Sequence, residues 1–303
     1  MAITTVRSGT ARTYENLEHP RQASRRRMTR MLGERVFPRV VLIAMCLVFI
    51  LPFYWMVALA LKSNAELSIY PPTLYPHSWQ WSNFKEATEV FPFWRFLWNT
   101  TAITFLTILG SVISCPIIAY GFSRIDWPGR DKVFMVVLAS VFIPFPVLIV
   151  ALFDIFAQLG WVNTWLPLIV PRFFGTAFWI FLVRQFFLQI PRDLSDAARI
   201  DGANEFQIFW SIIMPQSLPA LGVVAIFSGL AAWNDFFGPL IFLQDASKYT
   251  LSIGLTFFQS QDAYDVKYNL LMAASSLVVL PVVVLFLLFQ RTFVSGLNVG
   301  SIK

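Results

Sequence analysis

Charged residues are scarce in this sequence of 303 residues: Asp, Glu, Lys and Arg make up 13% of it, whereas hydrophobic residues make up 57%. The mean hydropathy is correspondingly high, at +0.63. A water-soluble fold cannot bury this much apolar surface, and its exterior normally carries about twice as much charge. The scarcity of charge therefore excludes an ordinary soluble domain and indicates that the protein is embedded in a lipid bilayer.

Histidine and cysteine are also rare, with two of each. His19 and His77 lie outside the apolar runs, and no His-Glu-x-x-His motif, nucleophile elbow or pair of intramembrane carboxylates can be assembled. Cys46 and Cys115 fall inside apolar runs, where cysteine behaves as a small hydrophobic residue. We therefore expect no catalytic residue, no metal site and no cofactor, which makes an intramembrane enzyme an unfavourable interpretation.

The apolar runs are long and continuous. They do not alternate strictly between polar and apolar residues, so helices rather than a β-barrel must satisfy the backbone within the bilayer. A run of roughly 20 residues can cross a hydrocarbon core of about 30 Å. We predict an all-α, polytopic membrane protein with six transmembrane helices, at residues 40–61, 96–123, 133–153, within 164–183, at 218–243 and at 268–289.

Five of these crossings are interrupted. Because proline removes a backbone hydrogen bond, Pro144 and Pro146 predict kinks in the third crossing, Pro116 in the second and Pro281 in the sixth. Arg172 lies in the fourth and Asp235 in the fifth, where a charge costs roughly 2.5–3.5 kcal/mol at a helix centre. Arg172 could extend to the outer interface or line a cavity, and Asp235 could hold the bundle together or contribute to a solute path.

The basic residues indicate how the chain is oriented. The net charge of +6 could suggest nucleic acid, but these residues gather in the N-terminal tail and at the ends of the apolar runs. If successive connections alternate between sides, 17 Lys and Arg residues lie on one side and 5 on the other, with one inside a span. The positive-inside rule then predicts cytoplasmic termini and no nucleic-acid partner.

The chain divides into a basic cytoplasmic tail, residues 1–36, and a membrane domain, residues 37–303. The tail is expected to be disordered or to lie on anionic lipid headgroups. The first apolar run is longer than the core of a signal peptide, so we expect an anchor that is not cleaved. The external connection at residues 62–95 is rich in Pro and Trp, which favours an interfacial loop or a docking surface for an external partner.

A patterned polar segment, residues 191–215, connects the fourth and fifth crossings on the predicted cytoplasmic side. Pro191 can start a helix and Gly202 can end it, and Asn204 with Gln207 resembles a capping pair for a second short helix. Phe206, Phe209 and Trp210 offer this second helix apolar contacts. The charges suit the dipole of the first helix, with acids at its start and a base at its end: Asp193, Asp196 and Arg199.

This segment resembles the permease family of ABC importers. The signature of that family is Glu-Ala-Ala, three residues, Gly, nine residues, Ile, one residue and Leu-Pro. With Asp in place of Glu and Met in place of Leu, this chain supplies the same spacing through Asp196-Ala197-Ala198, Gly202, Ile212 and Met214-Pro215. Trp233-Asn234-Asp235-Phe236 and the ending Phe289-Gln290-Arg291 with Gly296 and Gly300 look like the maltose-transporter type, the branch that serves carbohydrates.

The resemblance implies a transport subunit whose short cytoplasmic helices fit a cleft of an ATPase. ATP-driven closure of two ATPase copies would push on this coupling segment and rock the attached spans. The residues implied in coupling are Asp196, Ala197, Ala198, Arg199, Asp201, Gly202, Ile212 and Pro215. The other implied partners are a second permease subunit, an extracytoplasmic solute-binding protein, membrane lipid and a sugar-like solute. Because the chain lacks a phosphate-binding loop, its energy would come from the ATPase subunits.

The candidate solute path consists of Arg172, Asn234 and Asp235. A secondary transporter or channel is the alternative function, because six spans with two intramembrane charges could serve ion coupling. That alternative leaves the spaced cytoplasmic signature unexplained.

Overall fold

The computed structural model describes residues 36–260 and 267–298, with side chains for residues 36–258 and 267–290. The predicted basic tail lies outside these residues, except for its last one. Every regular element within the described ranges is helical. The chain divides into two units, Met1–Trp55 and Met56–Lys303, which we describe separately.

The described part of the first unit is most of helix α2 (Phe37–Ala60). Its 24 residues would extend for about 36 Å, which is enough to cross a bilayer. Pro52 lies inside the helix without ending it. The helix carries large exposed apolar side chains, with Val48 and Phe49 each 68% exposed, as expected of a segment surrounded by lipid.

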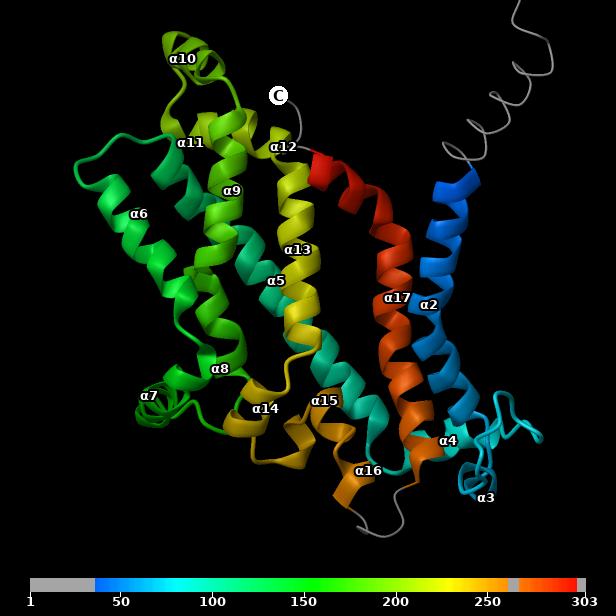
Figure 1. Ribbon diagram of the computed structural model, residues 1–303. Coiled ribbons are helices and arrows are strands. Elements are labelled where there is room, and N and C mark those ends of the chain that lie inside the picture. Colours follow the sequence, from blue (N-terminus) through cyan, green and yellow to red (C-terminus); the bar gives the residue numbers. More distant parts are fainter. Residues whose placement is uncertain (1–35, 261–266, 299–303) are drawn as a thin grey trace, which may run out of the picture. The chain divides into compact units, whose positions relative to one another are not determined.

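The second unit is a helical bundle with short elements at both ends (Figure 1). Its elements in chain order are α3 (Asn64–Leu67), α4 (Ser82–Glu89), α5 (Phe93–Ser123), α6 (Arg130–Ala139), η2 (Ser140–Phe142), α7 (Phe145–Gln158), α8 (Leu166–Ile169), η3 (Val170–Phe174), α9 (Ala177–Gln189), α10 (Arg192–Ile200), α11 (Glu205–Ile208), η4 (Phe209–Ile213), α12 (Met214–Gln216), α13 (Leu218–Trp233), α14 (Phe237–Phe242), η5 (Ala246–Lys248), α15 (Leu251–Gly254), α16 (Phe257–Ser260) and α17 (Tyr268–Asn298).

Helix α5 is the centre of this bundle, packing against α9, α13 and η3. Close approach depends on small residues: a Cβ added at Gly110 of α5 would lie 2.7 Å from the ring of Phe173 in η3. One buried cluster joins α5 and α9 to η4 and includes Cys115. Both cysteines were expected to be buried; Cys115 is, whereas Cys46 in α2 is exposed. Two further clusters fill the other half of the bundle.

Within the described ranges, four helical segments are long and apolar enough to cross a membrane: Phe37–Ala60, Phe93–Ser123, Leu166–Gln189 and Tyr268–Gln290. Two bent helix pairs, Arg130–Phe142 with Phe145–Gln158 and Glu205–Gln216 with Leu218–Trp233, bring the number to six if each pair counts as one span. All six predicted regions are thus helical, and the predicted all-α, polytopic fold is confirmed.

The third and fifth predicted crossings do not run straight. After η2 the chain is extended at Pro144, and α7 turns away by 103°, which realises the predicted kink as a sharp bend. The fifth crossing ends at Trp233, and α14 is a separate short helix, so Asp235 lies in a break between two helices rather than inside a span. Pro116 and Pro281 lie inside the unbroken helices α5 and α17.

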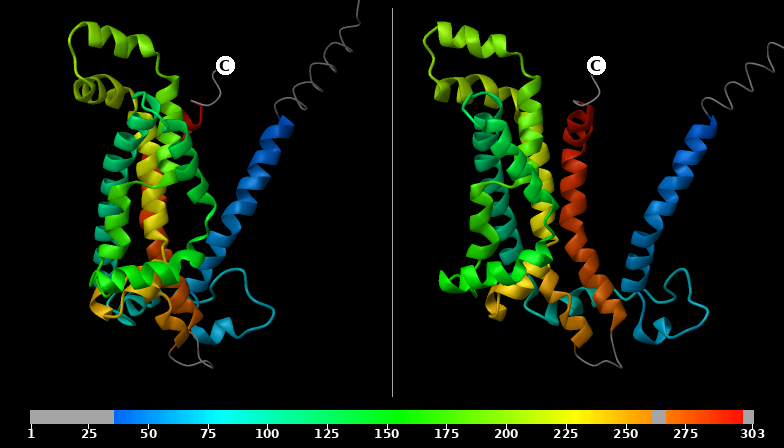
Figure 2. Two further views of the ribbon diagram at one scale, coloured as in Figure 1. Left: turned by 90° about the vertical axis from the view of Figure 1, so that its left-hand side faces the viewer. Right: turned by 60° about the vertical axis from the view of Figure 1, so that its left-hand side comes forward.

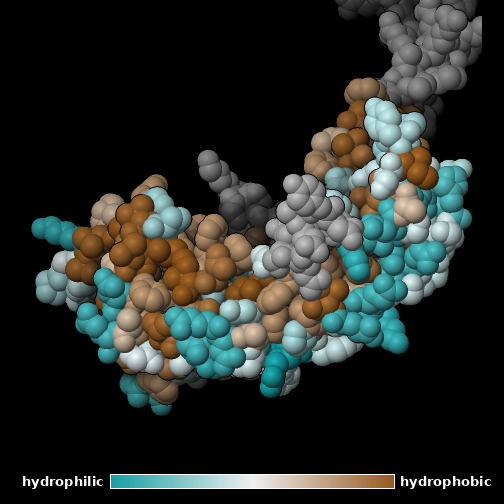
Figure 3. All heavy atoms as spheres, turned by 90° about the horizontal axis from the view of Figure 1, so that it is seen from below, coloured by the Kyte–Doolittle hydropathy of each residue, from teal (hydrophilic) through white to brown (hydrophobic). Residues whose placement is uncertain are grey.

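The two ends of the second unit differ. α10 and α11 lie at one end with the start of α6 and the last turns of α17, whereas α7, α14, α15 and α16 lie at the other (Figure 1). We call these the arm end and the opposite end. α10 projects beyond the bundle in both views of Figure 2. Seen from the opposite end, hydrophobic residues gather on one side and hydrophilic residues on another (Figure 3).

Candidate functional site

The patterned segment forms an arm, residues 191–216. It consists of the short helices α10 and α11, the π-helical turn η4 and the short helix α12. α10 begins at Arg192, with Pro191 as its N-cap, one residue later than the predicted start. Gly202 then ends the helix with a φ of +85°, a backbone conformation that glycine adopts without strain. A Cβ added at Gly202 would meet no atom within 4 Å, so backbone conformation rather than space favours glycine here.

The second short helix, α11, begins at the predicted capping pair. The backbone amide of Gln207 donates to Asn204 Oδ1, and the amide of Asn204 donates to Gln207 Oε1, both at 2.9 Å. A π-helical turn, η4, follows and leads into α12. This turn was not predicted from the sequence. Its signal is Pro215, because proline has no N–H to donate to the carbonyl four residues earlier.

The arm is anchored to the bundle through its second half. Ile208 and Ile213 are fully buried, and Phe209 is 6% exposed, in the cluster shared with α5 and α9. Ile212, the isoleucine of the predicted signature, is partly buried against the same cluster. Of the three aromatic residues that were expected to pack, Phe206 remains 70% exposed and Trp210 46% exposed.

Arg199 links the two halves of the arm. Its Nη1 lies 2.6 Å from Asp196 Oδ1, and its Nε lies 2.9 Å from Glu205 Oε1. The hydroxyl of Tyr120 in α5 donates to the other oxygen of Glu205 at 2.5 Å. The Arg199 guanidinium lowers the pKa of Glu205, and its bond to Glu205 raises the pKa of Arg199 itself. Glu205 and Tyr120 were not identified from the sequence.

The outer face of the arm is exposed and partly apolar. The signature residues Asp196, Ala197, Asp201, Gly202 and Pro215 are exposed, whereas Ala198 is half-buried against the bundle. The exposed apolar side chains on α10 and α11 are Leu194 (43%), Ile200 (87%) and Phe206 (70%). An apolar groove of about 320 Å³ runs between the arm and α5, lined by Ile117, Tyr120, Gly121, Ile125, Glu205, Phe206, Phe209 and Trp210.

The three candidate path residues lie far from the arm along the chain. Asn234 and Asp235 bond to the local backbone: Asn234 Nδ2 donates to the Leu230 carbonyl at 2.9 Å, and Asp235 Oδ1 accepts from the Gly238 amide at 3.1 Å. Arg172 is exposed in η3, directly after α8, and α8 packs against α14. Arg172 therefore lies on an element next to the break between α13 and α14, which contains Asn234 and Asp235.

The connection at residues 62–95, which was predicted to be external, contains a buried polar network. Glu66, 6% exposed, accepts hydrogen bonds from the hydroxyl of Thr73 at 2.9 Å and from the amide of His77 at 3.1 Å. Asn83 Nδ2 donates to the carbonyls of Ala60 and Lys62. The connection presents exposed aromatic residues at its surface: Tyr70, Tyr75, Trp79 and Trp81.

Comparison with known proteins relates this architecture to transport permeases. The family described as "Binding-protein-dependent transport system inner membrane component" matches residues 113–299. An arabinooligosaccharide transport permease of Halalkalibacterium halodurans is 36% identical over 71% of this chain and 76% of the relative. A trehalose/maltose transport permease of Thermococcus litoralis is 33% identical over 90% of this chain and 99% of the relative.

A solved structure has the same fold. It belongs to a bacterial ABC transporter involved in the import of the acidic polysaccharide alginate, and it superposes with a TM-score of 0.75. The match covers 88% of this chain and 97% of the other, at 22% sequence identity.

Proposed function

The chain belongs to the family of binding-protein-dependent transport system inner membrane components, and on this premise we propose that its arm is the surface through which an ATPase drives transport. The relatives described above are permease proteins of sugar transport systems, and the family is described as an inner membrane component. No comparison supports a secondary transporter or channel.

The observation that carries this proposal is the combination of a rigid attachment with an exposed tip. Ile208 and Ile213 bury the second half of the arm in the bundle, and Glu205 bonds to Tyr120 of α5. α10 projects beyond the bundle with Ile200 exposed (Figure 2). A partner that covered Ile200 would bury apolar surface and could move α10 without deforming its attachment.

We propose that the arm end faces the cytoplasm. The connections that contain α10 and the start of α6 belong to the side to which the sequence count assigns 17 Lys and Arg residues, against 5 on the other side. The positive-inside rule then assigns the last turns of α17 to the cytoplasmic side. Labelling of single cysteines introduced at Ile200 and Trp79 with a membrane-impermeant reagent tests this, because only the second should react in intact cells.

The transported solute is proposed to be a sugar or a related polar molecule, as the names of the relatives suggest. This chain would form half of the path, a second permease would form the other half, and an extracytoplasmic binding protein would deliver the solute. Two copies of the ATPase and the surrounding lipid complete the proposed assembly. Arg172 is the strongest solute contact of the three candidates, because Asn234 and Asp235 are engaged with the local backbone.

Substituting Gly202 by Trp tests the coupling role. The open space around Gly202 can hold the new side chain, so the bundle should fold, but the side chain and the altered turn would obstruct a docked partner. Gly129 is a matched control, because it lies at the same end in the α5–α6 connection with a φ of +86° and equally open surroundings.

Gly202→Trp should abolish solute uptake and uncouple ATP hydrolysis from solute, whereas Gly129→Trp should retain both. Both variants should be present in the membrane in equal amounts. Solute-stimulated ATPase activity and uptake that are unchanged in Gly202→Trp, or lost equally in both variants, would contradict the proposal.

A further inference from the structure

Arg124, which follows the last residue of α5, is a buried cation with no carboxylate partner among the described residues. Its side chain is buried, with the residue only 7% exposed, and its Nη2 donates to the backbone carbonyls of Phe187 and Ile190. Its Nε and Nη1 have no hydrogen-bond partner. Burial lowers the pKa of Arg124, and the positive charges of Arg192 and Arg199 add to this effect. A buried charge in this state is costly unless an anion compensates it.

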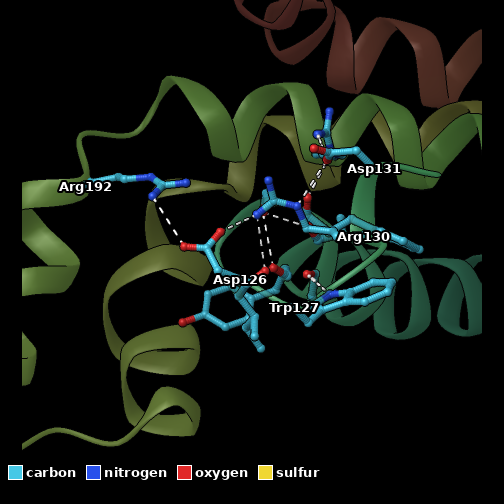
Figure 4. Close-up of polar contacts among 12 residues, drawn as sticks. Asp126, Trp127, Arg130, Asp131 and Arg192 are labelled. Atoms are coloured by element: carbon cyan, nitrogen blue, oxygen red, sulfur yellow. Dashed lines mark hydrogen bonds and ion pairs between the residues drawn. The ribbon is translucent and has the colours of Figure 1, made fainter. Parts of the chain in front are cut away.

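The neighbouring carboxylates form their ion pairs with other arginines. Asp196 favours the charge of Arg124 through space, but this is the smallest of the effects on the pKa of Arg124. Asp126 lies 2.6 Å from Arg130 and 3.8 Å from Arg192 (Figure 4). Asp131 forms ion pairs with Arg130 and Arg184. Asp196 and Glu205 form ion pairs with Arg199. The five guanidiniums of this cluster therefore meet four carboxylates: Arg124, Arg130, Arg184, Arg192 and Arg199 against Asp126, Asp131, Asp196 and Glu205. The excess positive charge lies at Arg124.

A cavity of about 310 Å³ opens beside Arg124, between α10 and the end of α5. Three arginines and three acids line it, and Arg124 is the one of these arginines that forms no ion pair among the described residues. It is lined by Arg124, Ile125, Asp126, Arg192, Ser195, Asp196, Arg199 and Glu205. Ser195 is 2% exposed, and its hydroxyl has no hydrogen-bond partner. Two buried polar side chains that line one cavity thus carry atoms without a hydrogen-bond partner: Nε and Nη1 of Arg124 and the hydroxyl of Ser195.

We propose that this cavity binds a phosphate-type oxyanion, either free phosphate or the headgroup of an anionic phospholipid. Guanidinium groups match the geometry of phosphate oxygens, and a serine hydroxyl can donate to a third oxygen. The volume holds one phosphate group with several waters, since each water occupies about 30 Å³. Arg124 follows directly on the apolar span that ends at Ser123, and a residue at the end of a span is expected at the level of the lipid headgroups.

The bound anion would bridge α10 to the end of α5 and so stiffen the base of the arm. This site is independent of the coupling role proposed above: the arm could dock an ATPase with or without the anion. Failure of one proposal therefore leaves the other intact.

The test measures backbone hydrogen exchange in residues 192–200 of the full-length chain, purified with the subunits that accompany it. The protein is placed in phosphatidylcholine nanodiscs and titrated with inorganic phosphate, with sodium chloride at equal ionic strength as the reference. At ten times the Kd, phosphate should slow exchange about tenfold, because the anion is released whenever the site opens. A parallel sample without phosphate contains phosphatidylglycerol nanodiscs.

Two variants and one control assign the effect to the cavity. Ser195→Ala removes an unpartnered hydroxyl and Arg192→Gln an exposed guanidinium, so both should fold and both should weaken phosphate binding about tenfold or more. Lys132→Gln removes an exposed cation from the same end that does not line the cavity, and its phosphate affinity should stay within about twofold of the wild type.

Protection by phosphate in phosphatidylcholine identifies the free anion as the ligand. Protection in phosphatidylglycerol without added phosphate identifies the lipid headgroup. The proposal is overturned if neither condition protects α10, if chloride protects equally well, or if Lys132→Gln weakens binding as much as Arg192→Gln does.

Discussion

The hydrogen bond from Tyr120 to Glu205 should hold the arm more firmly than the two ion pairs of Arg199 do. Tyr120 is 5% exposed, and its hydroxyl meets a charged acceptor. Hydrogen bonds to charged groups contribute about 1.5–3 kcal/mol. The side chain of Glu205 is 44% exposed, so water replaces part of the lost bond, and Tyr120→Phe should cost about 1.5 kcal/mol, the lower end of that range.

The ion pairs of Arg199 are weaker because they are exposed. Its side chain is 41% exposed, and those of its partners Asp196 and Glu205 are 59% and 44% exposed. Such pairs contribute about 0–1 kcal/mol each and are screened by salt. Arg199→Gln should therefore loosen the arm measurably at low salt and very little at about 1 M salt, where the Debye length is roughly 3 Å.

Hydrogen exchange at the amides of Gln207 and Ile208 measures both effects, because these amides are bonded only while α11 is formed. Tyr120→Phe should accelerate their exchange roughly tenfold at either salt concentration, since about 1.4 kcal/mol corresponds to a factor of ten. The argument is refuted if Arg199→Gln accelerates exchange more than Tyr120→Phe does at high salt, or if Tyr120→Phe has less than a twofold effect.

Two further predictions concern α5 and the acidity of the arm. Gly110→Ala should lower the free energy of unfolding by about 1–3 kcal/mol, because the new Cβ would lie 2.7 Å from the Phe173 ring and 3.1 Å from the backbone of η3. In the control Gly121→Ala, in the same helix, the new Cβ meets no atom within 4 Å, so this change should be neutral or stabilising. An equal loss of thermal stability in the two variants would contradict the packing argument. Because Arg199 lowers the pKa of Glu205, the ionised carboxylate stabilises the arm, and this stabilisation is fully present above the unfolded-state pKa of about 4.3. It should be lost as the pH falls from that value through the lower folded-state pKa. Hydrogen exchange at Ile208, corrected for its intrinsic pH dependence, should show this loss in the wild type and not in Glu205→Gln.

The parts of the arm that were predictable from sequence depend on interactions between near neighbours. The helix from Arg192, its end at Gly202 and the cap formed by Asn204 and Gln207 all follow from residues within four positions of each other. The same holds for the sharp bend at Pro144. Local rules of this kind require no knowledge of the rest of the fold.

The contacts that were missed join residues that are distant in the sequence. Tyr120 and Glu205 are 85 positions apart, and Arg124 is 63 and 66 positions from the carbonyls that it binds. The fifth crossing was predicted to extend too far, because residues 236–243 are apolar enough to continue a span. Hydropathy does not show that the chain breaks after Trp233 or that Asp235 accepts a hydrogen bond from the amide of Gly238 in the next helix. Composition identifies the bilayer as the solvent, but these tertiary contacts require the three-dimensional structure.

The connections of the arm determine which helices a force on α10 would reach. Glu205 transmits it to α5 through Tyr120, and α12 leads directly into α13 through Ser217, which is fully buried and donates to the Ile213 carbonyl at 2.5 Å. α5 and α13 pack closely along their length, and a Cβ added at Gly229 would lie 2.8 Å from Ile108. Because the arm is attached to both helices and they are packed together, displacement of α10 should move α5 and α13 as one body. Movement of one helix against the other would require breaking both the Tyr120 bond and the contact at Gly229.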